Sequence, residues 1–272
     1  MSLEIRHCRW RRGMVIFQEV LRDSLCHVTY FGIPGPSRYW PGTGMRRISD
    51  FDIVFVRDHA FGVVAGVHVP RGKEPVPEPI LTRLHPDEAG VARSLRGFRQ
   101  VEWTGGRLAW HAAAARLGVS AVPLLSGSER EPLPPSGLSA SITHKRDLAI
   151  ALVGDAARGW VGVDLENDAD ASTTIAARIL RPEEIRAVET LPESARAAAV
   201  LLRFSVKEAT YKAIYPLLRR FVGYTEARVD VAASGAIAVT LLLKDGAEVP
   251  TLEATCERFH GRILSAVRCL SK

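Results

Sequence analysis

The sequence predicts an α+β fold, with helices packed on mainly antiparallel strands, and three observations support this class. Residues 51–56 (FDIVFV) and 62–69 (GVVAGVHV) are rich in β-branched side chains and are predicted to form a hairpin. Pro182 and Pro192 are each followed by acidic residues and an apolar segment, as at the start of a helix. Residues 226–268 contain four short strand-like segments. Helices on antiparallel strands define the α+β class.

The other elements follow from local signals along the chain. Glycine and proline predict a loop at residues 32–44. Pro86 with its acidic neighbours predicts the start of one helix, and Gly118 caps the end of the next. The predicted helices span residues 84–95, 101–117, 180–188 and 192–216, and the later strands span 138–143, 148–154, 160–166, 226–233, 236–244, 251–257 and 262–268.

Length and composition bound the class of protein. A chain of 272 residues is long enough for one large domain or two smaller ones. With 47% hydrophobic and 24% charged residues, it is neither disordered nor collagen-like. The net charge of +6 suits an acidic partner. A turn before Trp160 predicts a split into residues 1–158 and 159–272.

The cysteines and the N-terminus indicate a cytoplasmic protein. Four scattered cysteines form no CxxC pair, which argues against a zinc site and favours a reducing compartment; they are Cys8, Cys26, Cys256 and Cys269. Gly13 to Val20 is too short and too polar for the apolar part of a signal peptide. No apolar segment reaches membrane-spanning length, so we expect no membrane association.

The motif GVDLE at residues 162–166 is a candidate metal site. Asp164 and Glu166 lie two residues apart on a predicted strand, so both carboxylates point to one face. Such a pair repels unless a cation joins it, and Mg²⁺ takes one or two carboxylates together with phosphate oxygens. Taken alone, the motif also fits two solvated acids at a strand end.

The helix segment FSVKEATYKA carries a second group of charges. Glu208 and Lys212 are four residues apart and share one face, and Lys207 lies on its flank. An ordinary helix ion pair is the alternative, although apolar neighbours such as Phe204 and Tyr211 make a partly buried pair there costly.

Two further segments hold candidate phosphate ligands. Thr143, His144 and Lys145 bring a hydroxyl, an imidazole and an ammonium group to the end of a strand. Arg107 lies in GGRLAWHAAAARLG, an alanine-rich helix with several basic neighbours. A histidine that caps a turn and a solvated basic helix face are the alternatives for these two segments.

In their order and spacing, these motifs resemble those of the 4′-phosphopantetheinyl transferases. The pattern runs from G-R-x-A-x-x-A through S-I-T-H and G-V-D-L-E to F-S-x-K-E-A-x-Y-K-A, over about residues 84–215. It is most similar to the single-chain type that serves siderophore, polyketide and nonribosomal peptide synthases. Phe204 and Thr143 stand where many relatives have Trp and Ser, which preserves the chemical type.

The resemblance implies a pseudo-dimer of two similar α+β halves in one chain, with the active site between them. It implies transfer of 4′-phosphopantetheine from coenzyme A to a serine hydroxyl of an apo acyl or peptidyl carrier protein, with release of adenosine 3′,5′-bisphosphate. Matched residue by residue, Asp164, Glu166 and Glu208 would bind Mg²⁺, for which Mn²⁺ is an alternative, and Glu208 would act as the base.

The same match also indicates which residues would contact the phosphate groups of coenzyme A. Lys212 and Lys207 would stabilise the leaving group and hold phosphate oxygens, while His144 and Arg107 would contact coenzyme A. Lys145 joins this set by its spacing and Thr143 by its hydroxyl. Residues 215–224, which include Arg219 and Arg220, are predicted to help dock an acidic carrier protein.

Two other functions stay open at this point, and both use the same charges differently. One is another Mg²⁺-dependent phosphoryl enzyme, such as a phosphohydrolase or nuclease. The other is a basic nucleic-acid-binding module without catalysis, which should interleave basic and aromatic residues. Aromatic residues make up 7% of the chain and do not cluster with basic ones, so we expect an enzyme that binds no nucleic acid. We also expect it to be a monomer.

Overall fold

The computed structural model describes residues 49–246 and 250–270, so the loop predicted at residues 32–44 lies outside the described part. The strands are β1 (Ile53–His59), β2 (Gly62–His68), β3 (Leu125–Ser126), β4 (Pro132–Leu133), β5 (Leu138–Lys145), β6 (Leu148–Asp155), β7 (Trp160–Asn167), β8 (Ala227–Val231), β9 (Ile237–Leu241), β10 (Leu252–Phe259) and β11 (Arg262–Cys269). The α-helices are α1 (Glu78–Leu81), α2 (Pro86–Ser94), α3 (Gly97–Arg116), α4 (Ala176–Ile179), α5 (Pro182–Glu189) and α6 (Glu193–Leu218), and the 3-10 helices are η1 (Ala156–Arg158), η2 (Asp168–Asp170) and η3 (Tyr224–Glu226).

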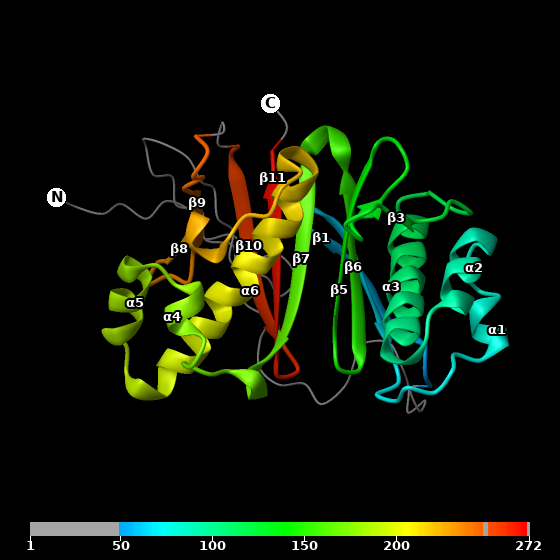
Figure 1. Ribbon diagram of the computed structural model, residues 1–272, viewed down its shortest axis with the longest axis horizontal. Coiled ribbons are helices and arrows are strands. Elements are labelled where there is room, and N and C mark those ends of the chain that lie inside the picture. The colour runs from blue at the N-terminus through cyan, green and yellow to red at the C-terminus, as the bar shows by residue number, and fades with distance from the viewer. Residues whose placement is uncertain (1–48, 247–249, 271–272) are drawn as a thin grey trace, which may run out of the picture.

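The first half of the described chain is an antiparallel sheet covered by one long helix. Its strands lie in the order β1-β2-β6-β5, and the predicted hairpin is confirmed as β1 and β2. Helix α3 packs on this sheet through a core that includes Val67, Trp110 and Ala151 (Figure 1). Gly105 permits the close approach, because a Cβ there would lie 2.3 Å from Val69 Cγ1.

The second half repeats this arrangement. Strands β10-β11-β7 form an antiparallel sheet, and α6 covers it (Figure 1). Here the close approach depends on Gly162 of β7, since a Cβ at this position would lie 1.9 Å from the carbonyl oxygen of Ala209 on α6. Ala209 and Ala213 are fully buried, so small residues on both elements bring the helix backbone next to the strand.

The two halves share one topology. In the first, β2 leads through helices to the hairpin β5–β6, whose second strand pairs antiparallel with β2. In the second, β7 leads through helices to the hairpin β10–β11, whose second strand pairs antiparallel with β7. The α+β pseudo-dimer is therefore visible in the strand order, although the two halves show no sequence repeat.

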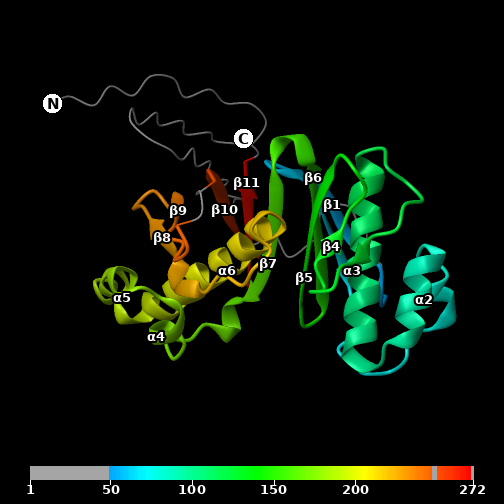
Figure 2. The same cartoon turned by 45° about the horizontal axis from the view of Figure 1, so that its top comes forward.

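The edge strands β5 and β7 meet where the halves join. Figures 1 and 2 show them side by side. Instead of a backbone ladder, Ser139 and Ser141 of β5 accept hydrogen bonds from the Val161 and Val163 N–H groups, at 2.8 and 3.0 Å. Behind this seam, apolar side chains from both sheets form one core; they include Val64, Ile150, Leu152, Val163, Leu165 and Leu264. The division after residue 158 stays a prediction; it falls at η1, between β6 and β7.

Two predicted helix boundaries were wrong. Helix α3 begins at Gly97 rather than residue 101, and α6 continues through Pro216 to Leu218. Pro216 has no N–H to donate to the Lys212 carbonyl, but packing carries the helix one turn further. It ends where Arg219 takes the left-handed conformation at φ 49°. Within residues 49–246 and 250–270, no helix is long and apolar enough to cross a membrane.

Candidate active site

Strand β7 presents two different faces because its side chains alternate. Val161, Val163 and Leu165 point into the core between the halves. Gly162 points at α6, so Asp164 and Glu166, which follow at spacings of two, project on the same side as Gly162. The glycine that admits the helix therefore also places both carboxylates beside it.

Asp164 is 5% exposed and has one satisfied and one unsatisfied oxygen. The Lys212 amine of α6 donates to Asp164 Oδ1 and to the Val163 carbonyl oxygen, both at 2.9 Å. Asp164 Oδ2 is buried and has no hydrogen-bond partner in the described part of the chain. A buried carboxylate oxygen without a donor is costly, which indicates a ligand at this position.

Glu166 is 7% exposed and binds a lysine from the other half. The Lys145 amine at the end of β5 lies 2.5 Å from Glu166 Oε2 and 3.7 Å from Asp170 Oδ2. Burial raises the pKa of Glu166, and the charge of Asp164 adds to this rise while Lys145 opposes it. The two carboxylates thus share excess negative charge, which two lysine amines partly neutralise.

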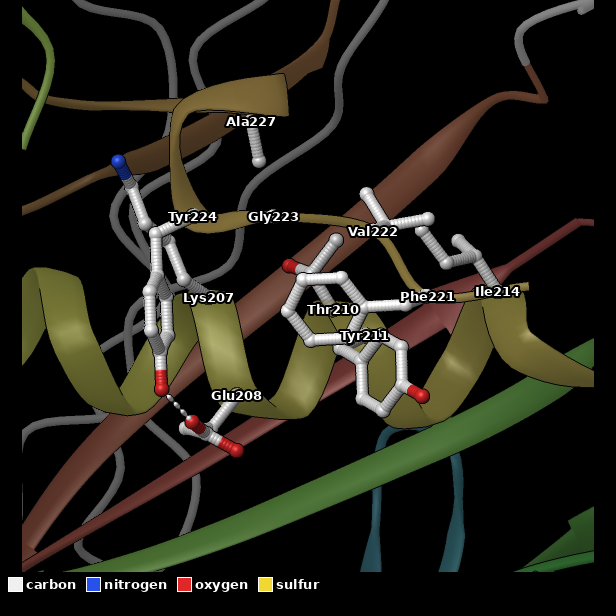
Figure 3. Close-up of a pocket in the computed structure, with 10 residues that line it drawn as sticks. All are labelled: Lys207, Glu208, Thr210, Tyr211, Ile214, Phe221, Val222, Gly223, Tyr224 and Ala227. Carbon is white, nitrogen blue, oxygen red and sulfur yellow. Dashed lines mark hydrogen bonds between the residues drawn. The ribbon is translucent and has the colours of Figure 1, made fainter. Parts of the chain in front are cut away.

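Glu208 lies on α6 at the rim of a pocket, and a tyrosine that the sequence did not single out orients it. The Tyr224 hydroxyl donates a short hydrogen bond to Glu208 Oε1, drawn in Figure 3. Burial and the neighbouring Glu208 carboxylate raise the pKa of Tyr224, so the phenol stays protonated and able to donate. The pocket lies between α6 and residues 221–227; Tyr211, Ile214, Phe221 and Val222 also line it.

The three predicted metal ligands are not assembled as one set. Within residues 49–246 and 250–270, no group of three His, Cys, Asp or Glu side chains lies close enough to hold a metal ion. The Asp164–Glu166 pair still fits Mg²⁺, because it offers hard oxygen donors on one face together with the unpartnered Asp164 Oδ2. The shared site that includes Glu208 stays a prediction.

The other phosphate candidates lie on β5, which divides them between its two faces. Thr143 is buried on the side of Ser141 and Lys145, facing β7. His144 points the other way, with Nδ1 3.4 Å from Glu102 Oε1 of α3, and its side chain is 38% exposed. Burial lowers the pKa of His144, and it lies within electrostatic reach of Lys212.

Arg107 and Lys207 are both buried, and both have partners within the protein. Arg107 is 6% exposed; it donates to the Leu124 carbonyl oxygen and to Ser126 Oγ, both at 2.9 Å. Its guanidinium stacks 3.6 Å from the Trp103 ring centroid, and burial lowers its pKa to about 10. Nε and Nη2 of its guanidinium are engaged by the protein, and its contact with coenzyme A stays a prediction.

Lys207 is buried away from Asp164 and Glu166. Its amine lies 2.6 Å from Glu184 Oε2 and donates to the Ile179 carbonyl oxygen at 2.8 Å. Both side chains of this ion pair are 1% exposed. Its charge is paired with Glu184 of α5, and Lys207 also lines the pocket beside Glu208 (Figure 3), so its contact with a phosphate stays a prediction.

The predicted docking arginines also have partners. Arg219 lies 2.8 Å from Glu131, and Arg220 contacts Asp245 at 2.6 Å and Glu226 at 3.1 Å. Phe221 beside them is 74% exposed. An apolar, basic-flanked surface is present here, although its charges are internally balanced.

Both halves of the chain match models of known protein families. A model described as the 4′-phosphopantetheinyl transferase superfamily matches residues 160–260, and one described as the 4′-phosphopantetheinyl transferase N-terminal domain matches residues 87–154. The 4′-phosphopantetheinyl transferase Svp of Streptomyces mobaraensis is 33% identical over 177 residues, covering 62% of this chain and 70% of Svp. The chain belongs to the 4′-phosphopantetheinyl transferase superfamily.

The chain matches a smaller share of the length of other similar proteins. The 4′-phosphopantetheinyl transferase PptT of Mycobacterium tuberculosis is 35% identical over 56% of this chain and 66% of PptT, and enterobactin synthase component D of Salmonella typhi is 38% identical over 44% and 50%. The chain thus matches about half to two thirds of these relatives. Among solved structures, the Helicobacter pylori holo-[acyl-carrier-protein] synthase in complex with coenzyme A has a TM-score of 0.34 and 19% identity, over 40% of this chain and 98% of that one.

Sequence reasoning missed Tyr224 and Glu184. Tyr224 follows α6 by a loop and carries no local motif, so only the fold reveals its contact with Glu208. Glu184 was visible as one of two acids after Pro182, which predicts a helix start and nothing more. Its partner Lys207 is 23 residues further along the chain.

Proposed function

We propose that this protein transfers the 4′-phosphopantetheine group of coenzyme A to a serine hydroxyl of an apo acyl or peptidyl carrier protein. The observation that carries the proposal is the seam where β5, β7 and α6 meet. There, two buried carboxylates on β7 lie between a lysine of each half, Lys145 and Lys212. Membership of the superfamily supports the same reaction.

The reaction forms a bond between the serine oxygen and the phosphorus of phosphopantetheine, and breaks the bond from that phosphorus to the leaving adenosine 3′,5′-bisphosphate. Glu208 accepts the serine proton, and Tyr224 holds one Glu208 oxygen so that the other faces the substrate. Lys212 stabilises the charge that develops on the leaving phosphate, since its amine already lies at the carboxylates.

The proposal includes one Mg²⁺, with Mn²⁺ as the alternative, which Asp164 and Glu166 would hold together with Glu208, the third ligand that the sequence predicts. When bound, the ion neutralises phosphate charge and polarises the attacked phosphorus. The unpartnered Asp164 Oδ2 supports a ligand at this place. His144, Lys145 and Thr143 lie on β5 beside this site and are proposed to contact the phosphates of coenzyme A. The apolar pocket beside Glu208 suits the pantetheine arm (Figure 3).

The carrier protein is proposed to approach over residues 215–224. The exposed Phe221 and Leu217 offer apolar contact, and Arg219 offers charge to an acidic partner. Because Arg220 also binds the buried Glu226, Arg219→Glu is the cleaner test. We expect it to raise KM for the carrier and to leave KM for coenzyme A unchanged. A monomer and a cytoplasmic location are part of this proposal.

The test is to incubate the full chain with coenzyme A, MgCl₂ and an apo carrier protein, and to measure the intact mass of the carrier. We expect a gain of one phosphopantetheine, lost in Asp164→Asn and Glu208→Gln. Glu193→Gln, an exposed acid at the start of the same helix, is the matched control and should react normally. No gain on several carriers, with release of inorganic phosphate instead, would establish a phosphohydrolase.

A further inference from the structure

Lys145 and Lys212 neutralise the same pair of carboxylates but are held differently. Lys212 is fixed by a carbonyl oxygen as well as by Asp164, at 2.9 Å each. The contacts of Lys145 are to carboxylates, Glu166 at 2.5 Å and Asp170 at 3.7 Å. Asp170 has a second cation, Arg146, at 2.5 Å. Lys145 can therefore leave without stranding a carbonyl oxygen or leaving Asp170 unpaired.

The position of Lys145 makes such a movement inexpensive. It is the last residue of β5, where the chain turns into β6, and its side chain is 31% exposed. A lysine amine sits on a flexible four-carbon stem and finds water readily from such a position. Glu166, by contrast, is a buried residue of β7, where it pairs with Ile263 of β11, and its backbone stays in place. When the contact between Lys145 and Glu166 breaks, it is therefore the lysine side chain that moves.

Lys145 also occupies the oxygen that a cation would need. A carboxylate oxygen that binds an ammonium group at 2.5 Å has no room on that side for a metal ion. A divalent cation that binds Glu166 through Oε2 therefore has to displace the amine. The displaced amine lies beside the seam, next to His144 and Thr143 on the same strand.

We propose that Lys145 is an exchangeable countercharge: it occupies Glu166 until a divalent cation binds, and the released amine then pairs with a phosphate of coenzyme A. This inference rests on the proposed function. This exchange makes the binding of the cation and of coenzyme A cooperative. The cation releases the Lys145 amine for a phosphate of coenzyme A, and that phosphate in turn stabilises the released amine. Lys145 thereby acts as a positioning residue that opposes cation binding in the free protein and favours coenzyme A in the loaded one.

The test is the affinity for Mn²⁺, measured from the electron paramagnetic resonance signal of the free ion, without and with coenzyme A. In Lys145→Met the full chain should bind Mn²⁺ about tenfold more tightly than the parent protein when coenzyme A is absent, a change of ~1.4 kcal/mol. The tightening of Mn²⁺ binding that coenzyme A produces in the parent should shrink by several-fold. Lys244→Met is the control for the loss of one positive charge; Lys244 is an exposed lysine of the turn after β9, and its removal should change neither value.

The outcomes separate this inference from the proposed function. If Asp164→Asn does not weaken Mn²⁺ binding, the carboxylate pair is not the cation site and the proposed mechanism fails. If Asp164→Asn weakens binding while Lys145→Met leaves it unchanged or weaker, only the exchange is refuted. An equal gain in Lys244→Met would show a general effect of surface charge and would also overturn the exchange.

Discussion

The buried ion pair between Lys207 and Glu184 predicts a large loss of stability when either partner is removed. The amine and Glu184 Oε2 are 2.6 Å apart, and both side chains are 1% exposed. At an effective dielectric constant of about 20, their attraction is about 6 kcal/mol, most of which offsets the cost of taking both charges out of water. Burial lowers the pKa of Lys207, and Glu184 opposes this shift.

Removing one partner leaves the other charge buried, which costs about 3–5 kcal/mol. In Lys207→Met, Glu184 keeps hydrogen bonds from the Arg181 and Val229 N–H groups, at 2.7 Å each, so we expect about 3 kcal/mol. In Glu184→Gln, Lys207 keeps the Ile179 carbonyl and an uncharged amide, and the loss should be similar. The double variant should lose less than the sum of the two, because it leaves no unpaired charge.

The assay is urea denaturation followed by circular dichroism, combined with KM for coenzyme A. If each single variant costs less than about 1 kcal/mol and KM for coenzyme A rises tenfold, Lys207 contacts phosphate and its assignment to the Glu184 pair is wrong. Lys244→Met, a lysine of the turn after β9, is the control for loss of one positive charge.

Three further predictions follow from contacts of single side chains. Tyr224→Phe removes the hydrogen bond to Glu208 and should lower kcat about tenfold with little change in KM for coenzyme A; an unchanged kcat would refute its positioning role. Burial lowers the pKa of His59 to about 4, so between pH 6.5 and 4 the unfolded chain binds a proton there that the folded chain does not. The free energy of unfolding should therefore decrease as the pH is lowered from 6.5 to 4, by at most about 3 kcal/mol. In His59→Gln this decrease, measured by urea denaturation at each pH, should be smaller. Arg107→Lys keeps the charge but loses the guanidinium group that holds the Leu124 carbonyl, and should lower the free energy of unfolding by about 2 kcal/mol. A normal stability together with a raised KM for coenzyme A would instead indicate that Arg107 contacts coenzyme A directly.

Much of the fold was predictable because local chemistry determines it. Segments rich in β-branched residues predicted β1 and β2, apolar segments separated by turns predicted β5 to β7, and Pro182 with two acids predicted the start of α5. The extension of α6 past Pro216 was not predictable, since tertiary packing outweighs the loss of one helical hydrogen bond. The small elements α1, α4, β3 and β4 were also missed, because two to four residues carry no periodic signal.

The sequence could predict the part of the candidate site that lies on one regular element, but it could not predict contacts with distant segments of the chain. The spacing of Asp164 and Glu166 on a strand placed both on one face, and the contact of Lys212 with Asp164 agrees with that placement. The burial of Arg107 was not visible in its own helix, where the basic neighbours also fitted a solvated face. Its burial comes from the segment around Leu124 and Ser126, whose path the sequence of the helix does not encode.

Helix geometry explains why the two lysines of FSVKEATYKA have different positions. Residues five apart on an α-helix are about 140° apart around its axis, whereas residues four apart differ by about 40°. Lys212 and Glu208 can therefore both face the seam, but Lys207 cannot face it as well. Since Lys212 contacts Asp164 on β7, Lys207 has to point toward the opposite layer, where it meets Glu184 of α5. A motif that carries both lysines thus needs two different partners, a carboxylate at the site and a buried one behind the helix. The second partner fixes the rotation of α6 about its own axis, and with it the direction in which Glu208 points.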